Sequence, residues 1–322
     1  MLSDIMANTS QCNIVEVTLL CYGFEIMKAS NGTNYLQFKA QDASGIVGCK
    51  MWGYTNTVVP EDLVYDIRCK INEYNGVIGF IAEQLSPRKD QHPSWYSLKY
   101  VNEEEFVDIV KKVDNLIKSI KSYKMMSIVY NVFKDYGLYS QSLAELFKSP
   151  IAVGTGAVIH HHVGWGGLLK HTCEVAIRAV SYLNKSPAAN RDLVVAGALL
   201  HDIGKIFSYE LVKGHYEIST RGHLIGHIGI GIEILSKYLT DDNEDIIMLL
   251  QHIIASHHDK VEWGALTRPQ MIEAFIVSQA DLADCIQELL INAEELYPDK
   301  DAHKIMGMRL FSPHVISNMI NT

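Results

Sequence analysis

The sequence predicts a chain of two domains, a β-rich domain followed by an all-α domain. The first hundred residues contain short alternating apolar runs separated by turn residues, which is the pattern of β-strands. From about residue 102 the apolar spacing becomes helical, and between about residues 166 and 295 one helical pattern follows another. A length of 322 residues is sufficient for two compact domains, each with its own core.

Five strands are expected in the N-terminal part. They are residues 15–20, 35–40, 46–52, 63–71 and 77–82, and the clearest turn signals are residues 30–33, residues 42–45 and the hairpin dipeptide Asn75-Gly76. Five short strands suit a small closed barrel, and the OB-fold is the usual five-stranded barrel. Residues 1–100 are therefore predicted to form an OB-fold-like domain that binds nucleic acid.

A helical linker is expected over residues 101–150. An acidic cluster at residues 103–105 suits the positive N-terminal end of a helix, and one apolar stripe follows it: Val107, Val110, Val113, Ile117 and Ile120. Two short helices are predicted over residues 125–136 and 141–148, and Pro150 marks a boundary. Residues 151–295 are predicted to form the all-α domain, and residues 296–322 a short helical or irregular tail.

The composition argues against a polyanion-coating protein, a membrane-spanning protein and a secreted protein. The net charge of −9 argues against non-specific coating of a polyanion. No apolar run approaches the roughly 18 residues of a membrane-spanning helix, and the N-terminus lacks the pattern of a secretory signal. The six cysteines are scattered without a C-x-x-C pair, as expected in a reducing compartment. We therefore expect a cytoplasmic protein with no membrane partner.

Histidine is concentrated in the helical part. Of the 14 histidines, all but His92, His303 and His314 lie between residues 160 and 258. Several histidines and two aspartates interrupt apolar helical stretches: His171, His201, Asp202, His227, His257, His258 and Asp281. Such groups are costly to bury unless they are paired or ligate a metal, so five helices that bring them to one centre would resolve the cost. A nitrogen and oxygen ligand set favours Mn, Fe, Co, Ni or Zn over Ca, and we expect Mn²⁺ first.

Taken alone, each of these residues is more often structural than a ligand. Their order H…HD…H…HH…D, with the intact H-D-x-G-K, resembles the HD-domain phosphohydrolase superfamily in its two-metal form. The resemblance implies an all-α HD domain in which His171, His201, Asp202 and Asp281 hold one ion. Asp202 would bridge to a second ion held by His227, His257 and His258. Two ions about 3.5–4 Å apart can activate water and clamp a phosphodiester. Lys205 would neutralise phosphate charge, so Asp202 and Lys205 are the predicted catalytic residues.

Three further segments narrow the resemblance. Residues 160–172 are similar to the HH-x-x-x-GGLLEHT signature, residues 221–228 to EG-x-L-x-GH, and residues 257–264 to HHG-x-x-EWG of the YhaM-type 3′→5′ exoribonuclease family. The family places an OB-fold ahead of an HD domain, which implies trimming of single-stranded RNA, and by the same chemistry DNA, from the 3′ end. Lys170, Asp259 and Ala265-Leu266 stand where the family has Glu, Gly and Ser-Pro. None of these departures removes a proposed ligand.

The predicted barrel contains candidate base-stacking residues. OB-folds bind single strands by stacking bases on aromatic side chains in a basic groove. The candidates are Tyr35, Phe38, Trp52 and Tyr54, with Lys39, Lys50 and Arg68 nearby in sequence, although core packing is the commoner role for any one such aromatic. Residues 1–100 contain eight Lys and Arg against ten Asp and Glu, so any such groove must be locally basic.

Two other functions stay open at this stage. A hydrolase of cyclic dinucleotides, other signalling nucleotides or dNTPs is the alternative enzyme. Glu262-Trp263-Gly264 stands where cyclic-dinucleotide HD enzymes carry GYP, which counts against them. The extra His227, His257 and His258 count against dNTP hydrolases, which resemble this chain only in the H…HD…D set. A non-enzymatic adaptor with a degenerate HD domain is disfavoured by the intact ligand set. The sequence also allows a homo-oligomer.

Other histidines keep open roles: residues 160–162 line the entrance or form a polar loop, His252 is structural, and His215 and His223 are unassigned. Asp284 is expected to hydrogen-bond to a metal-ligating residue rather than to bind the metal itself.

Overall fold

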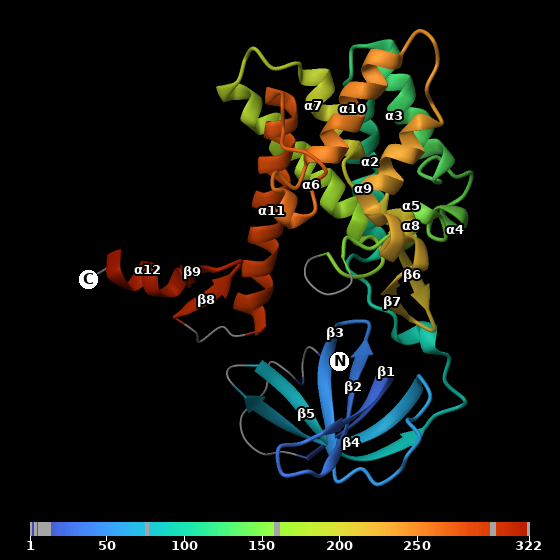
Figure 1. Cartoon of the computed structure of the whole chain (residues 1–322), viewed down its shortest axis with the longest axis vertical. Helices are drawn as coiled ribbons and strands as arrows, with labels where there is room; N and C mark the ends of the chain where they lie inside the picture. Colours follow the sequence, from blue (N-terminus) through green and yellow to red (C-terminus); the bar gives the residue numbers. More distant parts are fainter. Residues whose placement is uncertain are drawn as a thin grey trace. The chain divides into compact units, whose positions relative to one another are not determined.

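The computed structural model describes residues 2, 5, 14–74, 77–157, 162–296 and 301–320. The chain divides into two compact units (Figure 1). The first contains the described residues up to Lys99 together with Leu211–His215, and the second contains Tyr100–Glu210, Tyr216–Glu294 and the C-terminal segment. Among the described residues, no helix combines the length and the apolar character needed to cross a membrane.

The first unit is a closed five-stranded barrel, as the sequence predicts. Its strands are β1 (Ile14–Lys28), β2 (Asn34–Asp42), β3 (Gly45–Trp52), β4 (Leu63–Tyr74) and β5 (Val77–Pro87). They close in the order β1-β2-β3-β5-β4, with β3 and β5 parallel and the other pairs antiparallel. The OB-like barrel is therefore confirmed. The predicted turn at Asn75-Gly76 lies outside the described residues.

Strand alternation decides which barrel side chains are buried. Along β2, Leu36, Phe38 and Ala40 point into the core, whereas the residues between them are exposed or half-buried. The core also contains Leu19, Ile67 and Phe80. This pattern leaves the other face of β2 and β3 to solvent.

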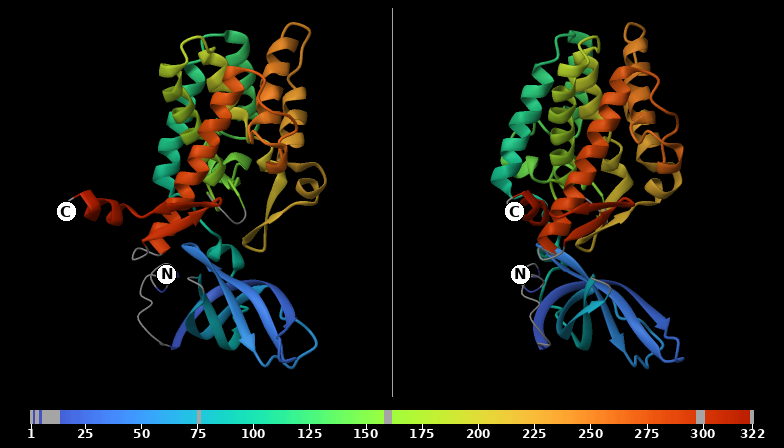
Figure 2. Two further views of the ribbon diagram at one scale, coloured as in Figure 1. Left: turned by 60° about the vertical axis from the view of Figure 1, so that its left-hand side comes forward. Right: turned by 90° about the vertical axis from the view of Figure 1, so that its left-hand side faces the viewer.

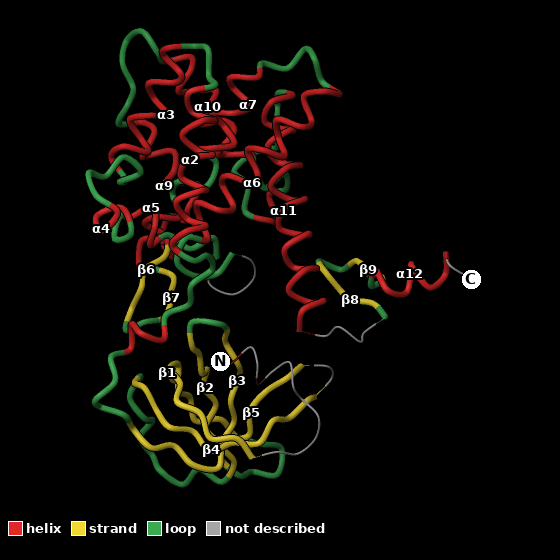
Figure 3. Tube along the Cα trace, turned by 180° about the vertical axis from the view of Figure 1, so that it is seen from behind, coloured by secondary structure: helices red, strands yellow, loops and turns green. Residues whose placement is uncertain are grey.

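The second unit is mainly helical. Its helices are α2 (Glu103–Lys118), α3 (Tyr123–Asp135), α4 (Leu143–Leu146), α5 (Pro150–Val153), α6 (Gly167–Tyr182), α7 (Arg191–Leu200), α8 (Lys205–Ser208), α9 (Thr220–Ser236), α10 (Glu244–Ser256), α11 (Ile272–Leu296) and α12 (Pro313–Ile320). Asn102, Ser122 and Asn190 cap α2, α3 and α7 through their side chains, which satisfies a free N–H at each N-terminus. The longer helices run side by side, as Figures 2 and 3 show.

The helices expected to form a linker are part of the core. Phe106, Val113 and Ile117 of α2, with Val129 and Phe133 of α3, are buried in one apolar cluster with α6, α7 and α10. Val113, Ile117 and Ile120 of the apolar stripe read from the sequence therefore lie on the packing face of the domain, whereas Val107 and Val110 of the stripe are half-buried. The expectation of a linker over residues 101–150 is corrected accordingly, because a linker would leave that stripe exposed.

Two hairpins interrupt the helices, and the sequence did not predict them. They are β6 (Tyr209–Val212) with β7 (His215–Ile218), and β8 (Ala302–Ile305) with β9 (Met308–Phe311). Strands of four residues are too short to show a period of two clearly. The C-terminal tail is therefore a hairpin followed by the short helix α12, and it follows the end of α11 (Figure 3).

Candidate metal centre

Five elements bring the predicted ligands to one place. His171 lies within α6 and Asp281 within α11, whereas the other ligands lie at breaks in helices. His201 and Asp202 directly follow α7, His257 and His258 directly follow α10, and His227 directly follows the kink in α9 at Gly226. Side chains at the end or kink of a helix are not held on the face that packs in the core, so they can point toward a common centre.

A glycine allows the two halves of the centre to approach. A Cβ atom added to Gly204 would lie 1.9 Å from the backbone oxygen of His227, far closer than any real contact. Gly204 is the glycine of the H-D-x-G-K segment. Its missing side chain therefore allows the turn that carries Asp202 to pack directly on α9, and so brings His227 to the centre.

The first cluster contains two histidines and two aspartates. His171 Nε2 lies 3.2 Å from Asp281 Oδ1, 3.3 Å from Asp202 Oδ2 and 3.2 Å from His201 Nε2. His201 Nε2 lies 3.4 Å from Asp202 Oδ2 and 3.8 Å from Asp281 Oδ1. All four residues are buried. Their side chains could hold one metal ion.

The second cluster contains three histidines. His227, His257 and His258 each offer a ring nitrogen, and these atoms lie within 4.8 Å of one another. The Nε2 atoms of His227 and His257 both lie 3.6 Å from Asp202 Oδ1. The two oxygens of Asp202 therefore face different clusters, Oδ2 the first and Oδ1 the second.

Three atoms at the junction are buried without a hydrogen-bond partner among the described residues. They are Asp202 Oδ1, His227 Nε2 and His257 Nε2. Buried polar atoms are almost always paired, so three such atoms facing each other require an explanation. A cation between them would provide one, because each atom can offer a lone pair. Imidazole and carboxylate ligands suit Mn, Fe, Co, Ni or Zn, so the residues fit a divalent metal.

Hydrogen bonds on the far side of the rings favour metal binding at Nε2. The Nδ1 atom of His171 lies 2.8 Å from Asp284 Oδ2, and the Nδ1 atom of His258 lies 2.8 Å from the Trp263 backbone oxygen. His201 and His257 likewise place Nδ1 at 2.7 and 2.8 Å from the backbone oxygens three residues earlier. Each Nδ1 can therefore donate a hydrogen bond and leave the Nε2 lone pair for a metal.

Asp284 connects His171 to a histidine that the sequence left undecided. Its Oδ2 atom also lies 2.9 Å from Nε2 of His162, and both side chains are buried. His162 therefore lies behind the first cluster and helps Asp284 to orient His171. The neighbouring His160 and His161 lie outside the described residues.

Charge and burial set the protonation of the centre. Burial opposes ionisation of Asp202, but Lys205 and His201 hold the pKa of its carboxyl well below the usual range. The Lys205 ammonium lies 2.6 Å from Asp202 Oδ2 and is itself buried. Burial lowers the pKa of His227 to about 3, and burial together with the nearby His258 also lowers the pKa of His257. The imidazoles of His227 and His257 are therefore neutral at physiological pH, the form in which imidazole binds metal.

The barrel candidates divide into two groups. Tyr35 and Trp52 face each other across β2 and β3 with ring centroids 4.7 Å apart, and Trp52 is 50% exposed. Lys50 Nζ lies 5.6 Å and 5.9 Å from the two ring centroids. Phe38 is only 2% exposed and stacks on Phe24 in the core, so its predicted role in contacting nucleic acid is wrong.

Two further histidines, His215 and His252, have local partners. His252 Nε2 accepts a hydrogen bond from the backbone N–H of Gln270, which supports the expected structural role. His215, which the sequence left unassigned, is buried and stacks on Tyr22 at a centroid distance of 3.9 Å.

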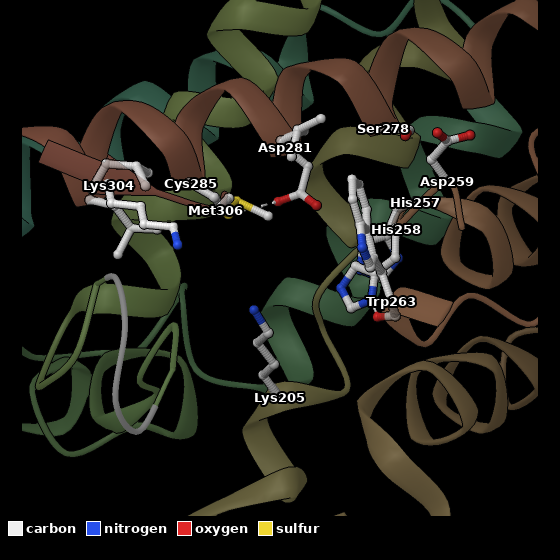
Figure 4. A pocket seen from close by; sticks show the side chains of 13 residues that line it. Lys205, His257, His258, Asp259, Trp263, Ser278, Asp281, Cys285, Lys304 and Met306 are labelled. Atoms are coloured by element: carbon white, nitrogen blue, oxygen red, sulfur yellow. Dashed lines mark hydrogen bonds between the residues drawn. The ribbon is translucent and has the colours of Figure 1, made fainter. Parts of the chain in front are cut away.

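A cavity of about 520 Å³ lies beside the metal centre (Figure 4). Lys205, His257, His258 and Asp281 of the centre line it, and Asp259, Trp263, Ser278, Leu282, Cys285, Leu289, Lys304, Ile305 and Met306 complete its walls. The volume lies within the ~300–1,000 Å³ typical of small-molecule sites. Sequence reasoning missed this cavity, because its walls come from segments far apart in the chain.

Comparison with known proteins identifies the helical domain. Residues 168–284 match the HD domain family, whose metal-binding character agrees with the clusters described above. The chain is 28% identical over 301 residues to the 3′-5′ exoribonuclease YhaM of Listeria innocua, which covers 91% of this chain and 92% of the relative. The YhaM proteins of Oceanobacillus iheyensis and Bacillus subtilis are each 28% identical over 291 residues. They cover 87% of this chain and 86% and 88% of their own lengths. The resemblance read from the motifs is confirmed.

Proposed function

We propose that this chain, which carries an HD domain and resembles the YhaM exoribonucleases over nine-tenths of its length, is a metal-dependent 3′→5′ exoribonuclease. The observation that carries the proposal is the position of Asp202, whose two oxygens face two separate clusters of ligand atoms. Such a bridging carboxylate is the arrangement that a two-metal phosphodiesterase requires.

The residues divide the work in this proposal. His171, His201, Asp202 and Asp281 would hold one divalent ion, and His227, His257, His258 and Asp202 the other. Bound ions supply a water of lowered pKa and a clamp on phosphate oxygens. Asp284 and the backbone carbonyls fix the imidazole tautomers. Lys205 holds Asp202 ionised and would add positive charge beside the phosphate.

The reaction is a hydrolysis at the last phosphodiester of the strand. Water forms a new bond to phosphorus, and the bond from phosphorus to the 3′-oxygen of the penultimate nucleotide breaks. That oxygen takes up a proton, and the terminal residue leaves as a nucleoside 5′-monophosphate. No oxidant or further co-reactant is required.

The barrel supplies a surface for the strand in this proposal. Tyr35, Trp52 and Lys50 form an exposed aromatic pair with a cation beside it, which suits stacked bases and a phosphate. The same stacking would accept DNA, so activity on DNA is part of the proposal. Mn²⁺ is the metal we propose first. A cytoplasmic location agrees with the described cysteines, all of which are free thiols.

The test uses purified full-length protein and three substrates. A 5′-labelled single-stranded RNA, a matching DNA and a cyclic dinucleotide are each incubated with Mn²⁺ or with EDTA. We expect an Mn²⁺-dependent ladder that shortens from the 3′ end. The double variant His201→Ala with Asp202→Ala should abolish shortening, whereas His252→Ala, outside the centre, should not. Intact strands beside a consumed dinucleotide would instead identify a hydrolase of small nucleotides.

A further inference from the structure

We propose that the cavity beside the metal centre binds the 3′-terminal nucleotide, and that the hairpin β8–β9, which lies outside the HD domain, forms one of its walls. This inference rests on the proposed function, because a terminal nucleotide is bound there only if the enzyme acts on strand ends. It assigns base contact to Trp263 and Met306 and phosphate contact to Lys304.

The position of the cavity is the first argument. Lys205, His257, His258 and Asp281 belong both to its lining and to the metal centre. A phosphodiester held at the metal centre would therefore place one of its two nucleotides in this space. The leaving nucleotide is the one that must be enclosed and then released, and a cavity of about 520 Å³ suits a single small molecule.

The chemistry of the walls fits a nucleobase. In Figure 4 the indole of Trp263 stands on one side of the cavity, and Met306 and Lys304 lie on the other. Leu282, Cys285, Leu289 and Ile305 add further apolar surface. Apart from the residues of the metal centre, few of the side chains that line the cavity are polar and could form hydrogen bonds with the edge of a base. A cavity of this kind recognises the face of a base and accepts all four bases.

Lys304 supplies charge for the phosphate. It is exposed, lines the cavity and makes no ion pair with any of the described residues. Its ammonium points into the cavity in Figure 4, on the opposite side from Trp263. A cation without a carboxylate partner, facing a space beside a phosphate-cleaving centre, suits the negative charge of a departing nucleotide.

The hairpin is fixed to the helix that carries Asp281. His303 of β8 is buried, and its Nε2 atom lies 3.1 Å from Oε1 of Glu294 on α11. Ile305 is also buried, so alternate residues of β8 anchor the strand while Lys304 and Met306 are exposed.

The turn of this hairpin has an unusual residue. Met306 has a φ of 47° and the following Gly307 a φ of 83°, the conformation of a tight hairpin turn. Asn, Asp or Gly normally occupies the first of these positions, because a longer side chain there is strained. A methionine in this place costs conformational energy, and its contact with the cavity gives a reason for retaining it.

Inhibition by a product analogue tests the cavity separately from RNA trimming. The assay measures hydrolysis of bis(p-nitrophenyl) phosphate by the full-length protein in Mn²⁺, with adenosine 5′-monophosphate added as the competitor. The inhibition constant is fitted against the uninhibited rate of each variant. We expect it to rise about tenfold in Trp263→Leu, as expected for a lost stacking contact, and several-fold in Lys304→Gln. Trp263→Phe should recover most of the affinity, because it keeps an aromatic face.

Arg309→Gln is the matched control. Arg309 lies opposite Lys304 in the register of the same hairpin but does not line the cavity. Its inhibition constant should equal that of the unchanged protein. Equal inhibition of Trp263→Leu, Lys304→Gln and the unchanged protein would overturn the inference, even if RNA is trimmed normally. Failure to trim RNA would refute the proposed exonuclease function, whereas the inhibition constants would still report on the cavity.

Discussion

Removal of the charge on Lys205 should reveal how strongly this side chain is coupled to the metal centre. Lys205 Nζ lies 2.6 Å from Asp202 Oδ2, and both residues are buried. Lys205→Met keeps the length of the side chain but leaves a buried carboxylate without its partner. Breaking one side of a buried ion pair costs about 3–5 kcal/mol. For a domain of about 150–250 residues, 1 kcal/mol shifts Tm by about 2–4 °C, so we expect Tm in EDTA to fall by roughly 10 °C.

Added Mn²⁺ should reduce this difference, because a divalent cation can replace the charge that Lys205 provides. Thermal unfolding with Mn²⁺ and with EDTA measures both quantities, and Mn²⁺ should raise Tm more in Lys205→Met than in the unchanged protein. Lys170→Met is the matched control, since Lys170 is partly exposed and pairs with Glu105 at 2.7 Å and Glu174 at 3.5 Å rather than with a residue of the centre. Its Tm should change by a few degrees at most, equally in both buffers. A Tm loss in Lys205→Met that is the same with and without Mn²⁺ would refute the coupling.

Three further substitutions test the centre and the barrel. Asp284→Asn removes the charge that orients His171, and Mn²⁺ affinity measured by calorimetry should fall about 10–100-fold. Gly204→Ala places a methyl group against the His227 backbone, so unfolding by urea should show a loss of more than about 2 kcal/mol. Trp52→Ala removes a stacking surface of the barrel, and binding of single-stranded RNA in EDTA should weaken by about 1–3 kcal/mol in fluorescence anisotropy.

The substitutions of Gly204 and Trp52 each have a counterpart that should do little. A Cβ atom at Gly48 meets no atom within 4 Å, so Gly48→Ala should be far milder than Gly204→Ala. Trp95 is 65% exposed but makes no ring contact with Tyr35, so Trp95→Ala should leave RNA binding nearly unchanged. Mn²⁺ affinity that is unchanged in Asp284→Asn would show that His171 is oriented without that carboxylate.

The candidate ligands stand out in the sequence because they violate the apolar pattern around them. His171 and Asp281 interrupt helices whose neighbours are buried, and the cost of burial makes such residues conspicuous. The Nδ1 partners of His201 and His257 were not predicted, because backbone carbonyls carry no residue signature. A histidine directly after the last residue of an apolar helix was the available signal.

In the barrel, the strands could be predicted from the sequence, but the inward-facing side chains could not. The five strands were visible as alternating runs, but alternation alone does not say which face of a strand is the inside. Phe38 and its neighbour Tyr35 are three residues apart and therefore point to opposite faces. Only the closed register of β2 between β1 and β3 assigns Phe38 to the core. The cavity was beyond prediction for a related reason, since residues near 263, 285 and 304 meet only through tertiary packing.

The hydrogen bonds at the ends of α7 and α10 connect metal loading to local backbone motion. His201 and His257 are bound to carbonyls in the final turns of these helices, carbonyls that have few other partners at a helix C-terminus. A ligand held by a cation therefore also holds the last turn of its helix closed. Removal of the metal should therefore first fray the C-terminal ends of α7 and α10. Amide hydrogen exchange should become faster at these two ends, while the interiors of the same helices remain protected.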